Sequence, residues 1–159
     1  MTRADPAPHI TIDEADPRGT AARICLAAYY AELARRFPGG FDVALSRDPD
    51  ATDMVRPKGA FFVASMNGRP VACVGLKGHG QWGEVKRLWV SPSARGQRLA
   101  TCLMALIETA ARDLGMTRLR LDTNSALPEA VALYRAAGWT EIPRFNDDPY
   151  PDVFFEKGV

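Results

Sequence analysis

The residues whose chemistry is easiest to interpret form a short basic loop, Arg95-Gly96-Gln97-Arg98, which directly precedes an apolar helical pattern. The first backbone N–H groups of a helix have no partners inside the helix, and the helix dipole adds partial positive charge there. A phosphate group can accept hydrogen bonds from those donors. Arg95 and Arg98 add full charges, and Gly96 allows close approach of the backbone. The loop therefore fits an anion site, with an ordinary strand-to-helix connection carrying solvated arginines as the alternative.

The elements that would position this loop are a strand before it and a helix after it. Residues 82–90 predict the strand, and Ser91-Pro92-Ser93 ends it because proline cannot donate to a strand ladder. Apolar residues then recur at helical spacing up to Gly115, which fits a C-terminal cap. They are Leu99, Cys102, Leu103, Leu106, Ile107, Ala110 and Leu114. The stretch has neither the Walker lysine nor the spaced glycines of a dinucleotide site.

The stretch from Glu84 to Asp113 resembles the signature of the Gcn5-related N-acetyltransferase (GNAT) superfamily, whose pyrophosphate loop reads Arg/Gln-x-x-Gly-x-Gly/Ala. Arg95 and Ala100 match the first and last positions of that motif, whereas Arg98 occupies the usual glycine position. The preceding V-S-P-S-A, the leucine-rich helix and L-Y-R-A-A-G-W at residues 133–139 also fit. The resemblance covers most of the chain, from about residue 60 to residue 157, and its motifs agree in order.

The resemblance implies acetyl-CoA as the co-substrate. Its pantetheine arm would pair with the backbone of Leu88, Trp89 and Val90, and Asn124 would hydrogen-bond the same arm, although asparagine also favours turns. If close approach requires glycine at position 98, Arg98 weakens binding. If its side chain points outward, it contacts a phosphate, which we favour because the rest of the motif is present. The pyrophosphate would lie over Arg95, Gly96, Gln97, Arg98, Leu99, Ala100 and Thr101.

Acetyl transfer from a thioester to an amine needs a proton donor for the leaving thiolate and an acceptor for the proton of the amine. The resemblance implies Tyr134, near the thioester sulfur, as the general acid, since a phenol is protonated at neutral pH. The alternative for Tyr134 is a core aromatic residue. Glu84 matches the glutamate of histone-acetylating members and is the candidate base. It could equally be a solvated residue paired with Lys86 or Arg87, with ordered water as the base.

The acceptor would be a small-molecule or peptide amine. The resemblance places it against the first helix, the loop after it and the C-terminal strands, with Tyr30, Phe37 and Phe41 as substrate-binding residues. Two charged groups give opposite expectations for its chemistry, and both stay open because most such residues are solvated. A cationic amine would suit Asp147, Asp148 and Asp152, whereas an acceptor with a carboxylate would suit Arg35, Arg36 and Arg144.

The composition is that of an ordinary globular protein of 159 residues, long enough for a single domain. The formal net charge of +1 gives no global attraction to nucleic acid or membrane, and no apolar run approaches a membrane span. The N-terminus lacks the apolar core of a signal peptide, so we expect a cytoplasmic location. Cys25, Cys73 and Cys102 predict buried free thiols, and His9 and His79 lack ligand-spaced companions, so we expect no metal site.

The order of elements predicts an α/β (α+β) fold, a mixed, mostly antiparallel central sheet flanked by helices. We expect a flexible tail at residues 1–8 and a single acetyltransferase domain at residues 9–159. The resemblance further implies that two strands, 82–90 and 117–122, splay apart to form the acetyl-CoA cleft. The expected strands are 9–12, 61–66, 71–76, 82–90, 117–121, 139–145 and 153–156, and the helices run from Asp16-Pro17 to Arg36, over 99–114 and over 128–137.

Two turn signals complete this outline. Asn67-Gly68 predicts a hairpin between the strands at 61–66 and 71–76, and Asp48-Pro49-Asp50 with Arg56-Pro57 punctuates a loop-rich segment at 41–59. The whole pattern leads us to expect an acetyl-CoA-dependent N-acetyltransferase that acts by direct attack of a primary amine in a ternary complex. A non-catalytic acyl-CoA-binding or regulatory domain is the alternative, because fold does not fix function. Dimers are common in the superfamily, so a homodimer stays open.

Overall fold

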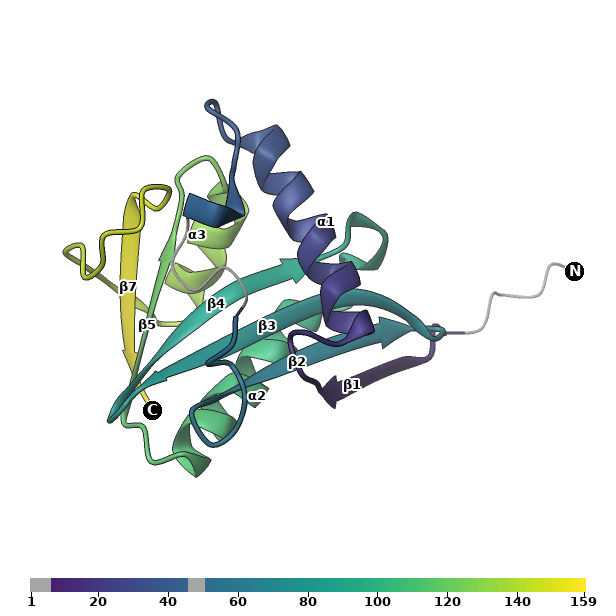
Figure 1. The fold of residues 1–159 in the computed structure, drawn as a ribbon, viewed down its shortest axis with the longest axis horizontal. Helices are drawn as coiled ribbons and strands as arrows, with labels where there is room; N and C mark the ends of the chain where they lie inside the picture. Colours follow the sequence, from purple (N-terminus) through teal and green to yellow (C-terminus); the bar gives the residue numbers. More distant parts are fainter. Residues whose placement is uncertain (1–6, 46–50) are drawn as a thin grey trace, which may run out of the picture.

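The computed structural model describes residues 7–45 and 51–159, and seven strands form one sheet in the order β1-β2-β3-β4-β5-β7-β6 (Figure 1). The first four strands pair antiparallel, β5 runs parallel to β4, and β7 pairs antiparallel with both β5 and β6. The expected mixed, mostly antiparallel sheet is confirmed. The strands are β1 (Ile10–Glu14), β2 (Gly59–Met66), β3 (Arg69–His79), β4 (Trp82–Val90), β5 (Arg118–Thr123), β6 (Thr140–Ile142) and β7 (Val153–Gly158).

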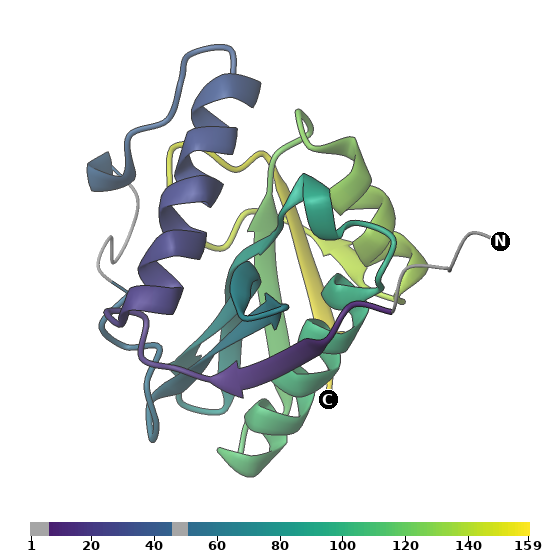
Figure 2. The ribbon, with the colours of Figure 1, turned by 90° about the vertical axis from the view of Figure 1, so that its right-hand side faces the viewer.

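Helices cover both faces of this sheet. Figure 2 shows α1 (Thr20–Arg36) on one side and α2 (Leu99–Asp113) with α3 (Pro128–Ala136) on the other. Two short 3-10 turns, η1 (Val43–Leu45) and η2 (Pro92–Ala94), follow α1 and β4. The apolar stripe predicted for α2 packs on the sheet through residues that include Leu103 and Ile107, both fully buried. A second cluster on the opposite face joins α1 to the sheet.

The hairpin signal proved reliable, and the two glycine caps also lie where they were predicted. Asn67 and Gly68 both have positive φ (53° and 79°), as a tight two-residue hairpin turn requires, and they join β2 directly to β3. Gly115 and Gly138 follow α2 and α3 with φ of 82° and 87°. Left-handed backbone at these positions ends each helix without steric cost, because glycine has no Cβ.

Two expected element boundaries were wrong, each for a visible reason. The helix α1 begins at Thr20, because the Asp16 carboxylate accepts the backbone N–H and the guanidinium of Arg18 and does not cap the helix. The strand expected at 139–145 is only Thr140–Ile142; after it, Arg144 donates to the carbonyls of Asn146, Asp148 and Pro151 and folds the chain into a loop.

Cys102 is exposed on α2, whereas Cys25 and Cys73 are buried free thiols as expected. The apolar spacing that included Cys102 extended past the buried stripe of the helix, which consists of Leu99, Leu103, Ile107, Ala110 and Ala111. The Asp48-Pro49-Asp50 turn and residues 1–6 of the expected tail lie outside the described part of the chain. At the other end of the loop-rich segment, the Arg56-Pro57 peptide bond is cis.

The sheet opens between β4 and β5. The two strands pair only from Trp82 with Arg118 to Val85 with Leu121, although β4 continues to Val90. On its other edge β4 carries a bulge, because Gly75 pairs with Lys86 and Cys73 with Trp89, so that two residues of β4 oppose one of β3. Arg87 lies at this bulge with φ of 61°. The expected splay is therefore present, and the edge of β4 beyond Val85 is not paired with β5.

Candidate active site

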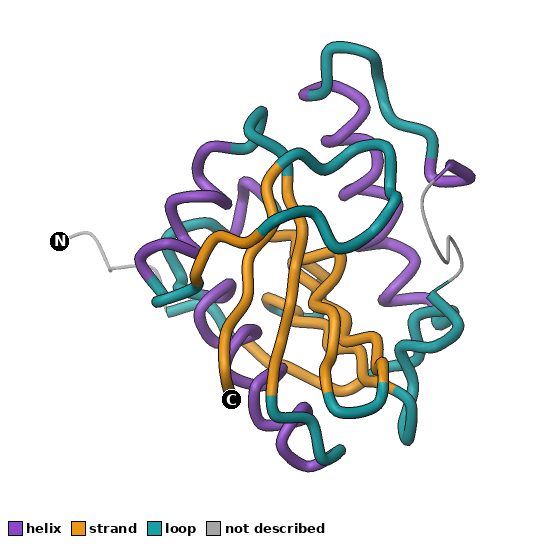
Figure 3. Tube along the Cα trace, turned by 90° about the vertical axis from the view of Figure 1, so that its left-hand side faces the viewer, coloured by secondary structure: helices purple, strands orange, loops and turns teal. Residues whose placement is uncertain are grey.

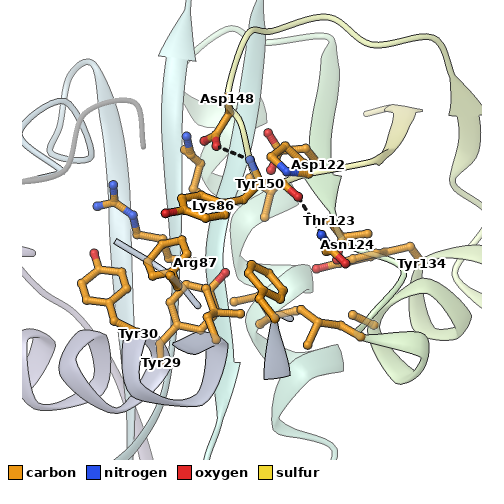
Figure 4. Close-up of a pocket in the computed structure, with 18 residues that line it drawn as sticks. Tyr29, Tyr30, Lys86, Arg87, Asp122, Thr123, Asn124, Tyr134, Asp148 and Tyr150 are labelled. Atoms are coloured by element: carbon orange, nitrogen blue, oxygen red, sulfur yellow. Dashed lines mark hydrogen bonds between the residues drawn. The ribbon is translucent and has the colours of Figure 1, made fainter. Parts of the chain in front are cut away.

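Two adjoining cavities occupy the opening between β4 and β5. The first, which we call the central cavity, is walled by α1 and the loop after it, by the ends of β4 and β5, by α3 and by the loop between β6 and β7 (Figure 4). The second, which we call the groove, runs along β4 to the loop before α2. The cavities adjoin because both are lined by Tyr29, Leu33, Leu88, Leu127 and Ala130.

The groove contains most of the residues predicted to bind the cofactor. Of the twelve, Gln97 and Thr101 are exposed and line neither cavity. Asn124 and Tyr134 line the central cavity. The groove is lined by the remaining ones, Leu88, Trp89, Val90, Arg95, Gly96, Arg98, Leu99 and Ala100.

The unusual residue Arg98 occupies a left-handed conformation, with φ of 57° and ψ of 29°, at the N-cap of α2. This geometry explains why glycine suits the position, since a side chain in this region costs on the order of 1 kcal/mol. The Arg98 side chain is exposed and borders the groove, so arginine strains the backbone at the edge of the groove. Gly96 is also left-handed, with φ of 86°, and a Cβ placed on it would meet nothing within 4 Å.

Two ion pairs connect α1 to the walls of the groove. Arg95 Nη2 lies 2.9 Å from Glu32 Oε1, which joins the loop before α2 to α1. Arg36 pairs with Glu129 of α3, and the Arg36 guanidinium lowers the pKa of that carboxyl below its usual value. Arg36 therefore lies beside the groove and not in the central cavity, where an acceptor carboxylate was expected to meet it.

Tyr134 contributes to the core and to the central cavity at once. Its ring is 6% exposed and lies in edge contact with Trp139 (6.0 Å between centroids), and it also packs against Phe155 (5.9 Å). The side chain lines the cavity from α3, opposite Tyr30 and Arg87 (Figure 4). Burial raises the pKa of the phenol above its ordinary value, and the nearby Asp122 charge adds to this, so the hydroxyl stays protonated at neutral pH.

Glu84 lies on the paired part of β4 and lines neither the central cavity nor the groove. It is 1% exposed, so the solvated alternative for it is wrong. One carboxylate oxygen is 3.1 Å from His79 Nε2 and the other 3.5 Å from Lys86 Nζ. Lys86 itself lines the central cavity, so Lys86 connects Glu84 to that cavity.

Asp122 is the carboxylate that the sequence analysis missed. It follows buried Leu121 at the end of β5, lines the central cavity and accepts a hydrogen bond of 2.7 Å from Asn146 Nδ2. Burial is the main cause that raises its pKa to about 6; the Asn146 bond and Lys86 oppose the rise, and the charges of Glu84 and Asp148 add to it. The alternation of buried leucines with polar residues in L-R-L-D, directly before the splayed gap, was the available signal.

Asn124 holds the loop between β6 and β7 in place. Its Nδ2 donates to the carbonyl of Tyr150 (2.6 Å), and its Oδ1 accepts the N–H of Ala126 (2.8 Å). Figure 3 shows this loop crossing one end of the strands, next to α3. The turn role considered for Asn124 is therefore present, and its contact with pantetheine stays a prediction.

Aromatic rings form the wall of the central cavity on the side of α1. The three residues predicted to bind the acceptor, Tyr30, Phe37 and Phe41, all line it, and Tyr150 completes the set. The centroid distances are 5.7 Å for Tyr30–Phe41, 4.5 Å for Phe41–Tyr150 and 5.9 Å for Phe37–Tyr150. Tyr150 Oη accepts from the backbone N–H of Asp42 at 2.7 Å, which ties the two loops together.

Of the charged residues expected at the acceptor site, Asp148 alone lines the central cavity. It is 6% exposed and accepts the N–H of Tyr150 (3.2 Å). The carboxylate of Asp152 accepts from the N–H and hydroxyl of Ser125, and Arg144 lies over the ring of Phe154. The expectation of a cationic acceptor is therefore supported by one carboxylate in the cavity. None of the three arginines that would suit a carboxylate-bearing acceptor lines it.

The sheet, its gap and the loop before α2 define the architecture of an acyltransferase. An acetyltransferase of the GNAT family from Staphylococcus aureus Mu50 superposes with a TM-score of 0.81 at 17% identity, covering 94% of this chain and 99% of that chain. At this identity, the likeness shows the fold alone.

The sequence places the chain within this class. It is 36% identical over 114 residues to the IAA acetyltransferase of Azospirillum brasilense, across 68% of this chain and 73% of the relative. It is 29% identical over 118 residues to the aminoalkylphosphonate N-acetyltransferase of Salmonella typhimurium, across 70% and 77%. Residues 26–139 match the acetyltransferase (GNAT) family. The chain belongs to this family, whose enzymes use acyl-CoA co-substrates, and the resemblance found in the sequence is confirmed.

Within residues 7–45 and 51–159, no helix combines the length and the apolar character needed to span a bilayer. Over the same part of the chain, no three His, Cys, Asp or Glu side chains gather in an arrangement that could hold a metal ion.

Proposed function

We propose that the protein is an acetyl-CoA-dependent N-acetyltransferase that moves an acetyl group to a primary amine in a ternary complex. The observation that supports this best is that the groove and the central cavity adjoin at the gap between β4 and β5. A thioester lying along the groove would reach an amine in the cavity directly. No covalent enzyme intermediate is needed. The name of the Salmonella relative includes acetylation of an aminoalkyl nitrogen, which agrees with an amine acceptor.

Holding the cofactor is the task of β4 and of the loop before α2. Because β4 does not pair with β5 beyond Val85, the backbone of Leu88, Trp89 and Val90 is available on that edge to a pantetheine arm. The pyrophosphate would meet the first turn of α2, where free N–H groups and the dipole favour an anion. Arg95 and Arg98 lie beside that turn, and both line the groove.

Transfer itself requires two proton movements. The amine nitrogen attacks the thioester carbonyl carbon, the C–N bond forms, the C–S bond breaks, and Tyr134 gives its proton to the departing thiolate. The base proposed from sequence, Glu84, would need a relay through Lys86 or water, because it does not line the cavity. Asp122 does line it, and its role is developed below.

The experiment that tests this function has two steps. Calorimetric titration with acetyl-CoA, and separately with CoA, measures occupation of the groove, and product mass spectrometry then measures acetylation across a library of primary amines. Binding followed by acetylation supports the proposal. Binding without any acetylated amine would favour the alternative of a non-catalytic acyl-CoA-binding or regulatory domain. Absence of binding at millimolar ligand would contradict both. A single acetyltransferase domain at residues 9–159, a cytoplasmic location and a homodimer stay predictions.

A further inference from the structure

The central cavity has two chemically different ends. One end is the ring cluster, which we define as Tyr30, Phe37, Phe41 and Tyr150. The other end carries the Asp122 carboxylate at the tip of β5, on the side where Tyr134 enters from α3 (Figure 4). A ligand that fills this cavity therefore meets flat apolar surfaces at one end and a carboxylate at the other.

We propose that the acceptor is a cationic primary amine joined by a short linker to an aromatic ring, with the ring against the ring cluster and the ammonium at Asp122, which takes its proton. This inference rests on the proposed N-acetyltransferase function. It adds the class of acceptor and a second catalytic residue to that function.

The ring cluster is held by contacts of its own and does not depend on a ligand for its shape. Tyr150 Oη accepts the N–H of Asp42 and donates to the Asp42 carbonyl (3.3 Å). The Tyr150 carbonyl is fixed by Asn124. Aromatic rings prefer offset or edge contacts at 4.5–7 Å between centroids. A further ring from a ligand would extend the cluster in the same geometry, whereas a flexible alkyl chain would gain only its buried area.

The charges around Asp122 favour a cation. From β4, Lys86 and Glu84 face it, but Lys86 Nζ lies 3.5 Å from Glu84 and shares its charge with that carboxylate. From the loop between β6 and β7 come Asp148 and the neutral amide of Asn146. The other titratable groups near it are the protonated phenols Tyr29 of α1 and Tyr134 of α3.

The remaining cation of the cavity lies apart from this end. Arg87 is placed over the ring of Tyr30, 6.0 Å from its centroid, on the side of α1. The balance near Asp122 is therefore negative, and an ammonium brought there gains an opposite charge. A carboxylate brought to the same place would meet Asp122 and Asp148.

The proton balance of the step is complete with these residues. The ammonium gives one proton to the Asp122 carboxylate, and the free amine forms the C–N bond with the thioester carbonyl. The C–S bond then breaks, and the thiolate takes the proton of Tyr134. A carboxyl that titrates about one unit below neutrality is ionised at pH 7 and is a stronger base than an ordinary aspartate. The second proton of the nitrogen passes through water to the Tyr134 phenolate and restores the phenol, and Asp122 then releases its proton to solvent.

The test compares three acceptors that differ by one group. Phenethylamine has the ring and the ammonium, butylamine lacks the ring, and phenylalanine adds a carboxylate. At saturating acetyl-CoA we expect kcat/KM for phenethylamine to exceed that for butylamine by about tenfold or more, because butylamine has no ring to contact the ring cluster. We expect an excess of about tenfold or more over phenylalanine as well, because Asp122 and Asp148 repel its carboxylate. Equal or higher kcat/KM for butylamine or phenylalanine would overturn the acceptor class while leaving N-acetyl transfer intact.

The variants test Asp122 itself. With Asp122→Asn we expect kcat/KM to fall by about 100-fold or more, with loss of the rise in rate near pH 6, while the calorimetric affinity for acetyl-CoA is unchanged. Asp122→Glu should retain a pH-dependent rate. The exposed neighbour substitution Asp147→Asn is the matched control and should leave the rate unchanged.

The outcomes separate the two proposals. An Asp122→Asn enzyme that binds acetyl-CoA and keeps the wild-type rate and pH profile would remove Asp122 from the reaction. A wild-type protein that binds acetyl-CoA but acetylates neither the three acceptors nor any amine of the library would overturn the N-acetyltransferase function, and this inference with it.

Discussion

At the scale of single residues, Asp122 shows how a carboxylate that lines the central cavity can weaken the fold that carries it. Burial of its carboxylate raises the pKa from 3.8 to about 6. A carboxyl with a raised folded-state pKa contributes stability that is fully present below its unfolded pKa and is lost as the pH rises through about 6. At pH 7 the protein therefore keeps an unfavourable, partly buried charge.

We expect Asp122→Asn to stabilise the protein at pH 7 by roughly 3 kcal/mol, since the pKa rises by about two units and each unit corresponds to about 1.4 kcal/mol. The asparagine can still accept from Asn146, so the hydrogen bond survives. Urea unfolding at pH 7 and below pH 4 measures the difference. The gain should vanish at the lower pH, where the wild-type carboxyl is also neutral. An equal gain at both values would show that charge is not the cause.

The second prediction at this scale concerns the hydroxyl of Tyr134. Tyr134→Phe removes one hydroxyl and keeps the ring that packs on Trp139 and Phe155. We expect turnover to fall by about 100-fold, the usual contribution of a positioned acid, with acetyl-CoA affinity and thermal stability nearly unchanged. Steady-state kinetics and calorimetry on the same preparation check this. A parallel loss of affinity would mean that the hydroxyl holds the cofactor and does not protonate the thiolate.

At the scale of elements, α1 is tied to the far wall of the groove by charge. The guanidinium of Arg95 forms an ion pair with Glu32 of α1, so a phosphate that enters the groove would compete with the Glu32 carboxylate for Arg95. We expect Glu32→Gln to increase acetyl-CoA affinity by about two- to fivefold at low salt, because an exposed ion pair is worth up to about 1 kcal/mol. Calorimetry at two salt concentrations checks this, and the difference should shrink with added salt.

A surface pair away from the groove provides the control for this variant. Arg135 and Glu141 are paired at 3.1 Å, and neither lines the groove. Glu141→Gln should leave the affinity unchanged. If both substitutions raise affinity equally, the effect is one of net charge and not of competition for Arg95.

The elements themselves were largely predictable because their signals are local. Apolar spacing identified α2, and Asn67-Gly68 fixed the hairpin between β2 and β3. The errors arose where a side chain forms hydrogen bonds that the spacing of apolar residues does not predict. Asp16 bonded to Arg18 and left the N-cap of α1 to Gly19, and the end of β6 was set by Arg144 binding three carbonyls.

The candidate site was predicted mainly through the resemblance, although the arginines before a helix already pointed to an anion site at 95–98. That loop borders the groove, and Tyr30 of α1 lines the central cavity together with Phe37 and Phe41, which follow α1. Asp122 and Tyr150 could not be recognised as cavity residues from the resemblance. Their positions depend on contacts with Asn146 and Asp42, respectively, across long separations in sequence. Glu84 matched a family position, yet the pairing of β4 with β5 buries it outside both cavities.

At the scale of the whole molecule, the cleft joins two otherwise separate cores. One cluster packs α2 and α3 on the sheet, and the other packs α1 on its opposite face. The groove is lined from α1, β4, α2 and α3 together, so a ligand there would connect both halves. Binding to the folded state alone stabilises a protein by mass action.

We therefore expect acetyl-CoA at 100 times its dissociation constant to stabilise the protein by about 2.7 kcal/mol. For a chain of this length that corresponds to a rise in Tm of roughly 5–10 °C. Thermal scanning across a ligand series measures the shift, and Arg95→Ala should require more ligand for the same rise. A Tm independent of ligand would contradict occupation of the groove.

The exposed thiol on α2 has a practical consequence. Cys25 and Cys73 are buried, so Cys102 is the cysteine that a maleimide dye would reach first. It lies in the first turn of α2, three residues beyond Leu99, whose side chain lines the groove. A fluorophore attached there would sit within one helical turn of the expected phosphates. The protein thus carries its own labelling position, from which stopped-flow fluorescence can follow the arrival and departure of the cofactor in real time.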